Sequence, residues 1–118
     1  MDNFARKNEV LAITKQLEEH KADNICLLDL DGQCSFSDYF IIATVRSRVH
    51  MNSLKKHLAE YFKQADINIL NSLNSKQDSG WILIDGGYFV IHLMEHEKRR
   101  FYELEKLWFK SKMIYHSS

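Results

Sequence analysis

The sequence of 118 residues contains no proline and only four glycines. Proline and glycine punctuate turns and linkers, so their scarcity argues against flexible connections between domains. No internal repeat is visible along the chain. A chain of this length can bury roughly two thirds of its extended surface, which is enough for one core. We therefore expect a single domain over residues 1–118, with its core at about residues 10–109.

Cysteine and net charge are also low. Two cysteines, Cys26 and Cys34, are too few for a disulfide framework, which favours a reducing compartment. Sixteen basic and sixteen acidic side chains balance, so the strong positive field that drives nucleic-acid binding is missing and direct nucleic-acid contact should be minor at most. No run approaches the ~20 apolar residues that span a bilayer, and residues 1–7 resemble neither a secretory signal nor a transit peptide. We expect a cytoplasmic protein with no membrane partner.

Hydrophobic spacing predicts the element order α-β-β-α-β-β-β-α. This order indicates an α/β domain with a mixed sheet of about five strands and helices packed on it. Ser47 is expected to cap the second helix, and Gly86-Gly87 to form a tight hairpin turn. The helices are expected at residues 3–21, 47–65 and 97–109, and the strands at 25–28, 39–44, 66–72, 81–85 and 88–94.

Each predicted helix carries an apolar stripe that should face the sheet. The stripes are Val10, Ile13, Thr14 and Leu17; Met51, Leu54, Leu58, Tyr61 and Ala65; and Phe101, Leu104 and Trp108. In the strand at 81–85, alternation places Trp81, Leu83 and Asp85 on one face and Ile82 and Ile84 on the other. One set should belong to the core and the other to an interface.

The strand that ends in Asp29-Leu30-Asp31-Gly32 resembles the first motif of the haloacid dehalogenase phosphatases. In that motif the first aspartate attacks phosphorus and the second acts as acid and base. The family pattern continues with threonine, where this chain has Gln33. A small metal-dependent nucleotidyltransferase or phosphatase that uses Asp29 and Asp31 is therefore the alternative function, and an exposed acidic turn is the favoured interpretation.

Other polar groups give weaker signals. His92 and His96 lie where a strand leaves the sheet, and a third zinc ligand could come only from His50, His57 or Cys34, so we expect structural or surface histidines. The basic cluster Lys98-Arg99-Arg100 is interleaved with glutamates, which is typical of a solvated helix face. We expect no catalytic residue, cofactor or metal site.

Three blocks of sequence carry a resemblance that runs from about Val10 to Trp108. The chain is similar to the ribosomal silencing factors of the Iojap family. The blocks are Ile25-Cys26-Leu27-Leu28-Asp29 with Gly32, Ser35, Ser37-Asp38-Tyr39-Phe40-Ile41-Ile42-Ala43-Thr44, Ser47 and His50; Trp81-Ile82-Leu83-Ile84-Asp85 with Gly87 and Val90-Ile91-His92; and Arg99-Arg100-Phe101-Tyr102-Glu103-Leu104-Glu105-Lys106-Leu107-Trp108.

The resemblance implies a nucleotidyltransferase-like α/β domain without catalytic activity. It further implies binding to ribosomal protein number fourteen of the large ribosomal subunit (uL14), which blocks association with the small subunit and represses translation. An exposed Trp-bearing strand also leaves a homodimer open. The candidate partner-binding residues are Trp81, Leu83, Asp85, Tyr88, Arg99, Tyr102 and Glu103.

Three positions depart from the family pattern. Val45 stands where glycine is common, and valine resists a positive φ. Tyr88 replaces an acidic residue after the hairpin glycine, which should make the rim of the interface less acidic. Asn24 also occupies a usually acidic position.

Overall fold

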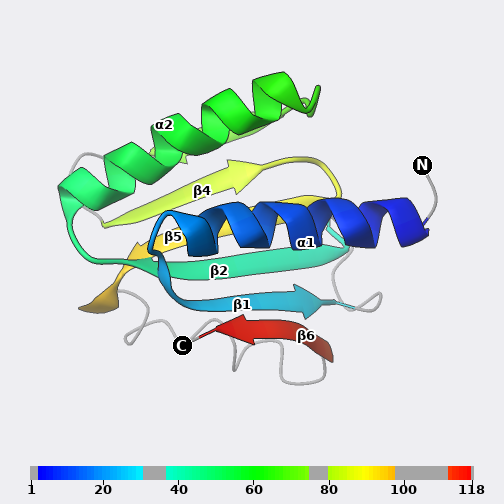
Figure 1. The fold of residues 1–118 in the computed structure, drawn as a ribbon, viewed down its shortest axis with the longest axis horizontal. Coiled ribbons are helices and arrows are strands. Elements are labelled where there is room, and N and C mark those ends of the chain that lie inside the picture. The colour runs from blue at the N-terminus through cyan, green and yellow to red at the C-terminus, as the bar shows by residue number, and fades with distance from the viewer. Residues whose placement is uncertain (1–2, 31–36, 75–79, 98–111, 118) are drawn as a thin grey trace.

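The computed structural model describes residues 3–30, 37–74, 80–97 and 112–117 of the chain (Figure 1). These residues form two helices and six strands. The elements are α1 (Asn3–Glu19), β1 (Asp23–Asp29), β2 (Tyr39–Val45), α2 (Arg48–Gln64), β3 (Asn71–Asn74), β4 (Trp81–Asp85), β5 (Phe89–Glu95) and β6 (Lys112–Ser117).

The strands form one mixed sheet in the order β3-β4-β5-β2-β1-β6. The pairing of β2 with β5 is parallel, and every other described pairing is antiparallel. The predicted α/β class is confirmed, and so is the pairing of the first two strands. The sheet has six strands rather than about five, because β6 adds an edge strand next to β1 that no hydrophobic run had indicated.

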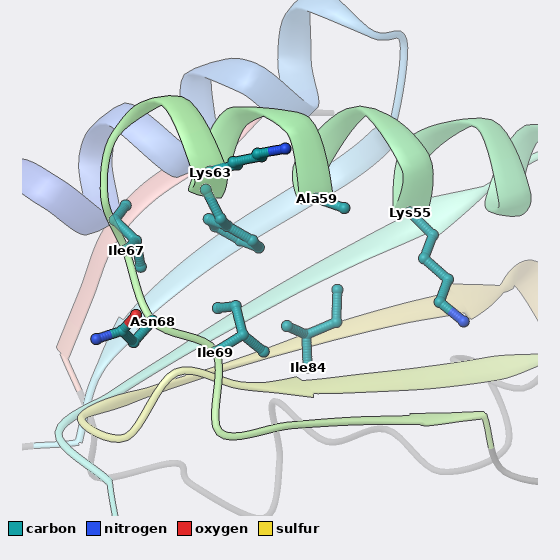
Figure 2. A pocket seen from close by; sticks show the side chains of 8 residues that line it. Lys55, Ala59, Lys63, Ile67, Asn68, Ile69 and Ile84 are labelled. Atoms are coloured by element: carbon teal, nitrogen blue, oxygen red, sulfur yellow. The ribbon is translucent and has the colours of Figure 1, made fainter.

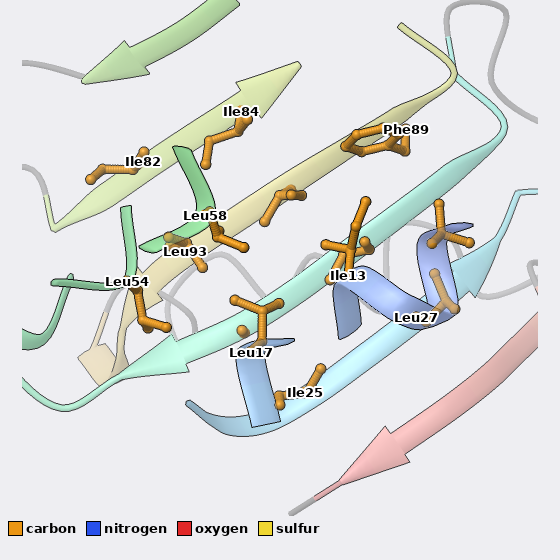
Figure 3. Packing of buried hydrophobic residues seen from close by; sticks show 14 of the residues in the cluster. Ile13, Leu17, Ile25, Leu27, Leu54, Leu58, Ile82, Ile84, Phe89 and Leu93 are labelled. Carbon is orange, nitrogen blue, oxygen red and sulfur yellow. The ribbon is translucent and has the colours of Figure 1, made fainter. Parts of the chain in front are cut away.

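Both helices cover the same face of this sheet (Figure 1). The predicted stripe of α1 is buried, and Ile13 and Leu17 pack above Ile25 and Leu27 of β1 (Figure 3). On α2, Leu58 belongs to the same core cluster. This face of the sheet is therefore filled by side chains whose spacing matches the helical and strand periods.

The other face of the sheet carries a second apolar cluster. Its members come from alternate positions of the central strands and from Leu30, which directly follows β1, since residues two apart on a strand share a face. Trp81 and Leu83 of β4 are half-buried at its border. The buried members are Leu28, Leu30, Phe40, Ile42, Val90 and Met94.

The start of α2 follows the prediction. The Ser47 hydroxyl oxygen accepts the backbone N–H of His50 at 3.0 Å, which satisfies one of the free donors of the first turn. The ring of His50 accepts the backbone N–H of Arg46 at Nδ1, 3.0 Å away. Its Nε2–H is therefore left to donate to the carbonyl of His20, 2.9 Å away. His50 thus ties the end of α1 to the beginning of α2.

Further along α2 the predicted stripe was partly wrong. Phe62 is buried, whereas Tyr61 is half-buried and Ala65 is exposed at the C-cap. The next residue of α2 that is buried against the sheet after Leu58 is therefore Phe62, four positions on, and not Tyr61, three positions on. Both spacings lie on the same side of a helix, so the sequence pattern did not separate them.

The strand predicted at residues 66–72 was also wrong in its bounds, since β3 begins at Asn71. The helix ends through Asp66, whose φ of 57° is left-handed, and Ile67 N–H donates to the Phe62 carbonyl at 2.8 Å. Residues 67–70 are then needed to pass from the helix layer to the edge of the sheet. The helix predicted at 97–109, with Phe101, Leu104 and Trp108, extends beyond the described residues.

The structure accommodates Val45 and Asn24, two of the three residues that depart from the family pattern. Val45 continues β2 as a buried strand residue. Asn24 has a φ of 50° where the register of β1 against β2 shifts, a conformation that asparagine tolerates better than most residues. Neither substitution disturbs the core.

We expect Leu58→Ala to lower the free energy of unfolding by about 2–5 kcal/mol, because Leu58 is fully buried between α2 and the sheet and its loss leaves a cavity. Urea denaturation measures the effect. Val49→Ala on the same helix is the control, since Val49 is 79% exposed and its truncation should change the stability by less than about 0.5 kcal/mol. Equal losses for the two variants would contradict this assignment of the core.

Candidate interaction surface

The hairpin of β4 and β5 is closed by the predicted glycine turn. Gly87 has a φ of 93°, which favours glycine, and Gly86 N–H donates to the Phe89 carbonyl at 2.9 Å. A carboxylate oxygen of Asp85 accepts the Gly87 N–H at 2.8 Å. Part of the hydrogen-bonding capacity of Asp85 is therefore used to hold the turn.

Strand alternation along β4 is as predicted. Ile82 and Ile84 are buried in the core beneath the helices, while Trp81 and Leu83 pack half-buried at the border of the second cluster. Asp85 is half-buried as well. Trp81 and Leu83 hence lie on the face of the sheet that α1 and α2 do not cover.

A histidine on the neighbouring strand fixes the indole of Trp81. Trp81 Nε1–H donates to Nδ1 of His92 at 3.2 Å, and the two ring centroids are 5.8 Å apart. His92 is only 5% exposed and also packs edge-on against Phe40, at 4.8 Å between centroids. Because Nδ1 must act as the acceptor, the proton of neutral His92 resides on Nε2. The indole is thereby held in one orientation.

Burial lowers the pKa of His92 to about 4 from its ordinary value of 6.5. Its Nε2 atom is buried and has no hydrogen-bond partner among the described residues. Protonation at Nδ1 would remove the acceptor that Trp81 uses. The contact between the two rings therefore requires neutral His92.

The start of β4 is fixed by the backbone of Gly80, the residue before Trp81. Gly80 precedes Trp81 with a φ of 68°, and its carbonyl accepts the Glu95 N–H at 2.8 Å. A side chain at Gly80 would collide with the Glu95 carboxylate, which Arg48 of α2 binds at 2.8 Å. Glycine is thus needed at this position for Trp81 to take its place in the hairpin.

Tyr88 lies elsewhere. Its hydroxyl donates to the Glu9 carboxylate, its ring lies 4.9 Å from the Arg6 guanidinium, and it packs against the core on the helix side. Burial, reinforced by Glu9, raises the pKa of its hydroxyl. The structure therefore does not bring Tyr88 together with Trp81, and a role for Tyr88 in partner binding stays a prediction.

The other candidate catalytic, metal-binding and partner-binding residues lie partly inside and partly outside the described residues. His96 is exposed, in contrast to His92, and Asp29 ends β1. Within the described residues no group of three histidine, cysteine, aspartate or glutamate side chains is arranged to hold a metal. The candidates outside the described residues are Asp31, Cys34, Arg99, Tyr102 and Glu103.

Comparison with known sequences gives a consistent result. The family model described as "Ribosomal silencing factor during starvation" matches residues 4–117. The ribosomal silencing factor RsfS of Zymomonas mobilis is 32% identical over 96 residues, which cover 81% of this chain and 71% of that protein. The mouse protein named "Mitochondrial assembly of ribosomal large subunit protein 1" is 30% identical over 111 residues. That match covers 91% of this chain and 48% of the mouse protein, so the chain spans about half of its length.

Solved structures agree with the sequence matches. A protein from Chromobacterium violaceum superposes with a TM-score of 0.77 at 30% identity, covering 87% of this chain and 84% of the other. A protein from Bacillus halodurans gives a TM-score of 0.73 at 26% identity, covering 86% and 94%.

The six-stranded sheet with two helices on one face is a small α/β domain of the same architecture as these structures. With the family model matching nearly its whole length, the chain belongs to the ribosomal silencing factor family. Among the residues that the structure describes, no helix has the length and apolar character that a membrane crossing requires.

We expect the folded protein to lose stability as the pH falls from about 6.5 toward 4. In that interval the unfolded chain binds a proton at His92 that the fold excludes, so unfolding becomes more favourable with each step of acidification. The lowered pKa corresponds to roughly 3 kcal/mol. Urea denaturation at several pH values measures the slope.

His92→Phe is the matched variant for this measurement, because it keeps a ring next to Trp81 and Phe40 and removes the titrating group. Burial also lowers the pKa of His57, so a smaller slope of the same sign should persist in the variant. Identical slopes for the variant and the original protein would rule out His92 as the source.

Proposed function

We propose that this protein binds the large ribosomal subunit at uL14 through the surface around Trp81 and Leu83, and thereby prevents the small subunit from joining. The effect is repression of translation by steric exclusion, with no catalytic step. The proposal places the protein in the cytoplasm, the compartment that its sequence favours.

The observation that carries the proposal is the state of Trp81. It is half-buried on the sheet face away from α1 and α2, and His92 holds its indole in one orientation. Tryptophan is enriched among the residues that contribute most to binding energy. A side chain that is already ordered loses less conformational entropy on binding. Trp81 therefore has the properties of an interface anchor.

Leu83 and Asp85 extend this anchor along β4. Leu83 adds apolar area next to Trp81, and the half-buried carboxylate of Asp85 supplies a negative charge toward the turn. A basic side chain on the partner would complement it. Stable interfaces bury about 1,200–2,000 Å² in total, so this strand would form only part of the contact. Arg99, Tyr102 and Glu103 stay proposed as further partner-binding residues.

The comparisons support the large subunit as the partner. The mouse relative is named for the assembly of the large subunit of the mitochondrial ribosome, and the bacterial relatives are named as silencing factors. A homodimer formed through the Trp81 strand would use the same apolar area. Dimerisation and ribosome binding would then compete.

We expect the purified protein to co-sediment with isolated large subunits and to lower the yield of joined ribosomes when small subunits are added. Trp81→Ala should weaken large-subunit binding at least tenfold, because loss of a central aromatic anchor typically costs about 2 kcal/mol or more. Sucrose-gradient sedimentation and a titration of labelled protein against large subunits measure the two effects.

Val49→Ala provides the matched control, because it truncates a 79% exposed apolar residue on the helix-covered side of the molecule. It should leave binding unchanged. Urea denaturation of both variants separates a loss of binding from a loss of folding. Absence of large-subunit binding by the original protein, or equal binding by the folded Trp81→Ala variant, would sink the proposal.

A further inference from the structure

The strand β4 presents different side chains to the two faces of the sheet. Ile82 and Ile84 belong to the core under the helices, and Ile84 lines an apolar groove beside α2 (Figure 2). Trp81 and Leu83 lie on the opposite face, at the border of the second cluster. Of these two half-buried side chains, only the indole carries a hydrogen-bond donor. Its N–H needs an acceptor wherever the indole is removed from water.

This donor is satisfied inside the protein. Trp81 Nε1–H donates to Nδ1 of His92 at 3.2 Å. The imidazole has little freedom to turn away, because it is only 5% exposed and packs edge-on against buried Phe40. The register of β4 on β5 sets His92 opposite Leu83 and diagonal to Trp81, so the backbone fixes the distance between the two rings. The acceptor is therefore built into the sheet and is present before any partner arrives.

An internal acceptor changes what a partner has to offer to the indole. A donor that becomes buried without an acceptor lowers the affinity of a complex by about one to two orders of magnitude. Because His92 already accepts the N–H, Trp81 can enter an apolar pocket without this loss. Leu83 beside it adds apolar surface and no polar group. An acceptor on the partner would gain little, since the donor is already used.

We propose that His92 is a positioning residue that satisfies the Trp81 indole from within, so that the partner of this surface receives Trp81 in an apolar pocket without a hydrogen-bond acceptor. This inference rests on the proposed function, because it describes how the surface around Trp81 contacts the large subunit. It adds the chemistry of the recess in the partner, which is aliphatic side chains around the indole. His92 acts through Trp81, since its own side chain is buried.

The affinity for isolated large subunits tests the proposal. His92→Phe keeps a ring at this position and removes the acceptor, so burial of the indole leaves its N–H unpaired. We expect this variant to bind large subunits about tenfold more weakly than the original protein. In a Trp81→Phe background there is no N–H to satisfy, so His92→Phe should then weaken binding by less than about twofold. His92→Asn should retain much of the affinity, because its Oδ1, like Nδ1 of histidine, is an acceptor two bonds from Cβ.

The indole N–H signal in the NMR spectrum of the free protein reports on the contact without a partner. The Trp81 signal, identified by its absence from Trp81→Phe, should shift upfield in His92→Phe and exchange faster with solvent. Ile91→Val is the matched control, because Ile91 is the buried neighbour of His92 on β5 that faces the helices. It should leave both the indole signal and large-subunit binding unchanged. Thermal unfolding confirms that each variant is folded.

The outcomes separate this proposal from the proposed function. An indole signal that His92→Phe leaves in place would overturn the proposal alone. So would equal large-subunit affinity for His92→Phe and the original protein, the result expected if the partner itself supplies an acceptor. A loss of affinity that persists in the Trp81→Phe background would also overturn it, since His92 would then act without the indole. No binding by the original protein would overturn the proposed function and this proposal with it.

Discussion

The parallel pairing of β2 with β5 at the centre of the sheet determines where the other elements lie. Parallel neighbours cannot be joined by a tight turn, so the chain between them must cross over the sheet, and α2, β3 and β4 form that connection. The crossover covers one face with α2 and returns β4 to the far side of β5. The same pairing sets Phe40 beside Val90 and Ile42 beside His92. The surroundings of His92, and through it of Trp81, follow from this register.

The two faces of the sheet consequently serve different purposes. The face under α1 and α2 holds the larger core, and Tyr88 is fixed there by Glu9 and Arg6 of α1. On the other face, Trp81 and Leu83 remain half-buried at the edge of the second cluster. A one-residue shift in the register of β4 would exchange its two sets of side chains. The glycine turn and the Asp85 contact that closes it protect the surface against that shift.

Much of the fold could be predicted from the sequence because α1 and α2 carry buried apolar residues at helical spacing, β1, β2 and β5 are continuous apolar runs, and β4 alternates. Alternation in β4 likewise separated Trp81 from Ile82. What local patterns could not supply was contact between distant residues, such as Tyr88 with Glu9, the bounds of β3, and the edge strand β6, since both strands are short and carry few apolar residues. The Trp81–His92 pair was also missed, although the position of the glycine turn fixes a register that sets His92 opposite Leu83 and diagonal to Trp81.

The cost of keeping histidine at position 92 argues that the orientation of Trp81 matters. Its neighbours Ile91, Leu93 and Met94 are apolar, and an apolar side chain would avoid both an Nε2–H that has no partner among the described residues and the penalty on protonation. A buried donor without a partner costs about 1–3 kcal/mol. Packing alone therefore favours another residue at this site. What histidine adds is an acceptor for the indole N–H, and an indole held in place is useful chiefly where another molecule is to meet it.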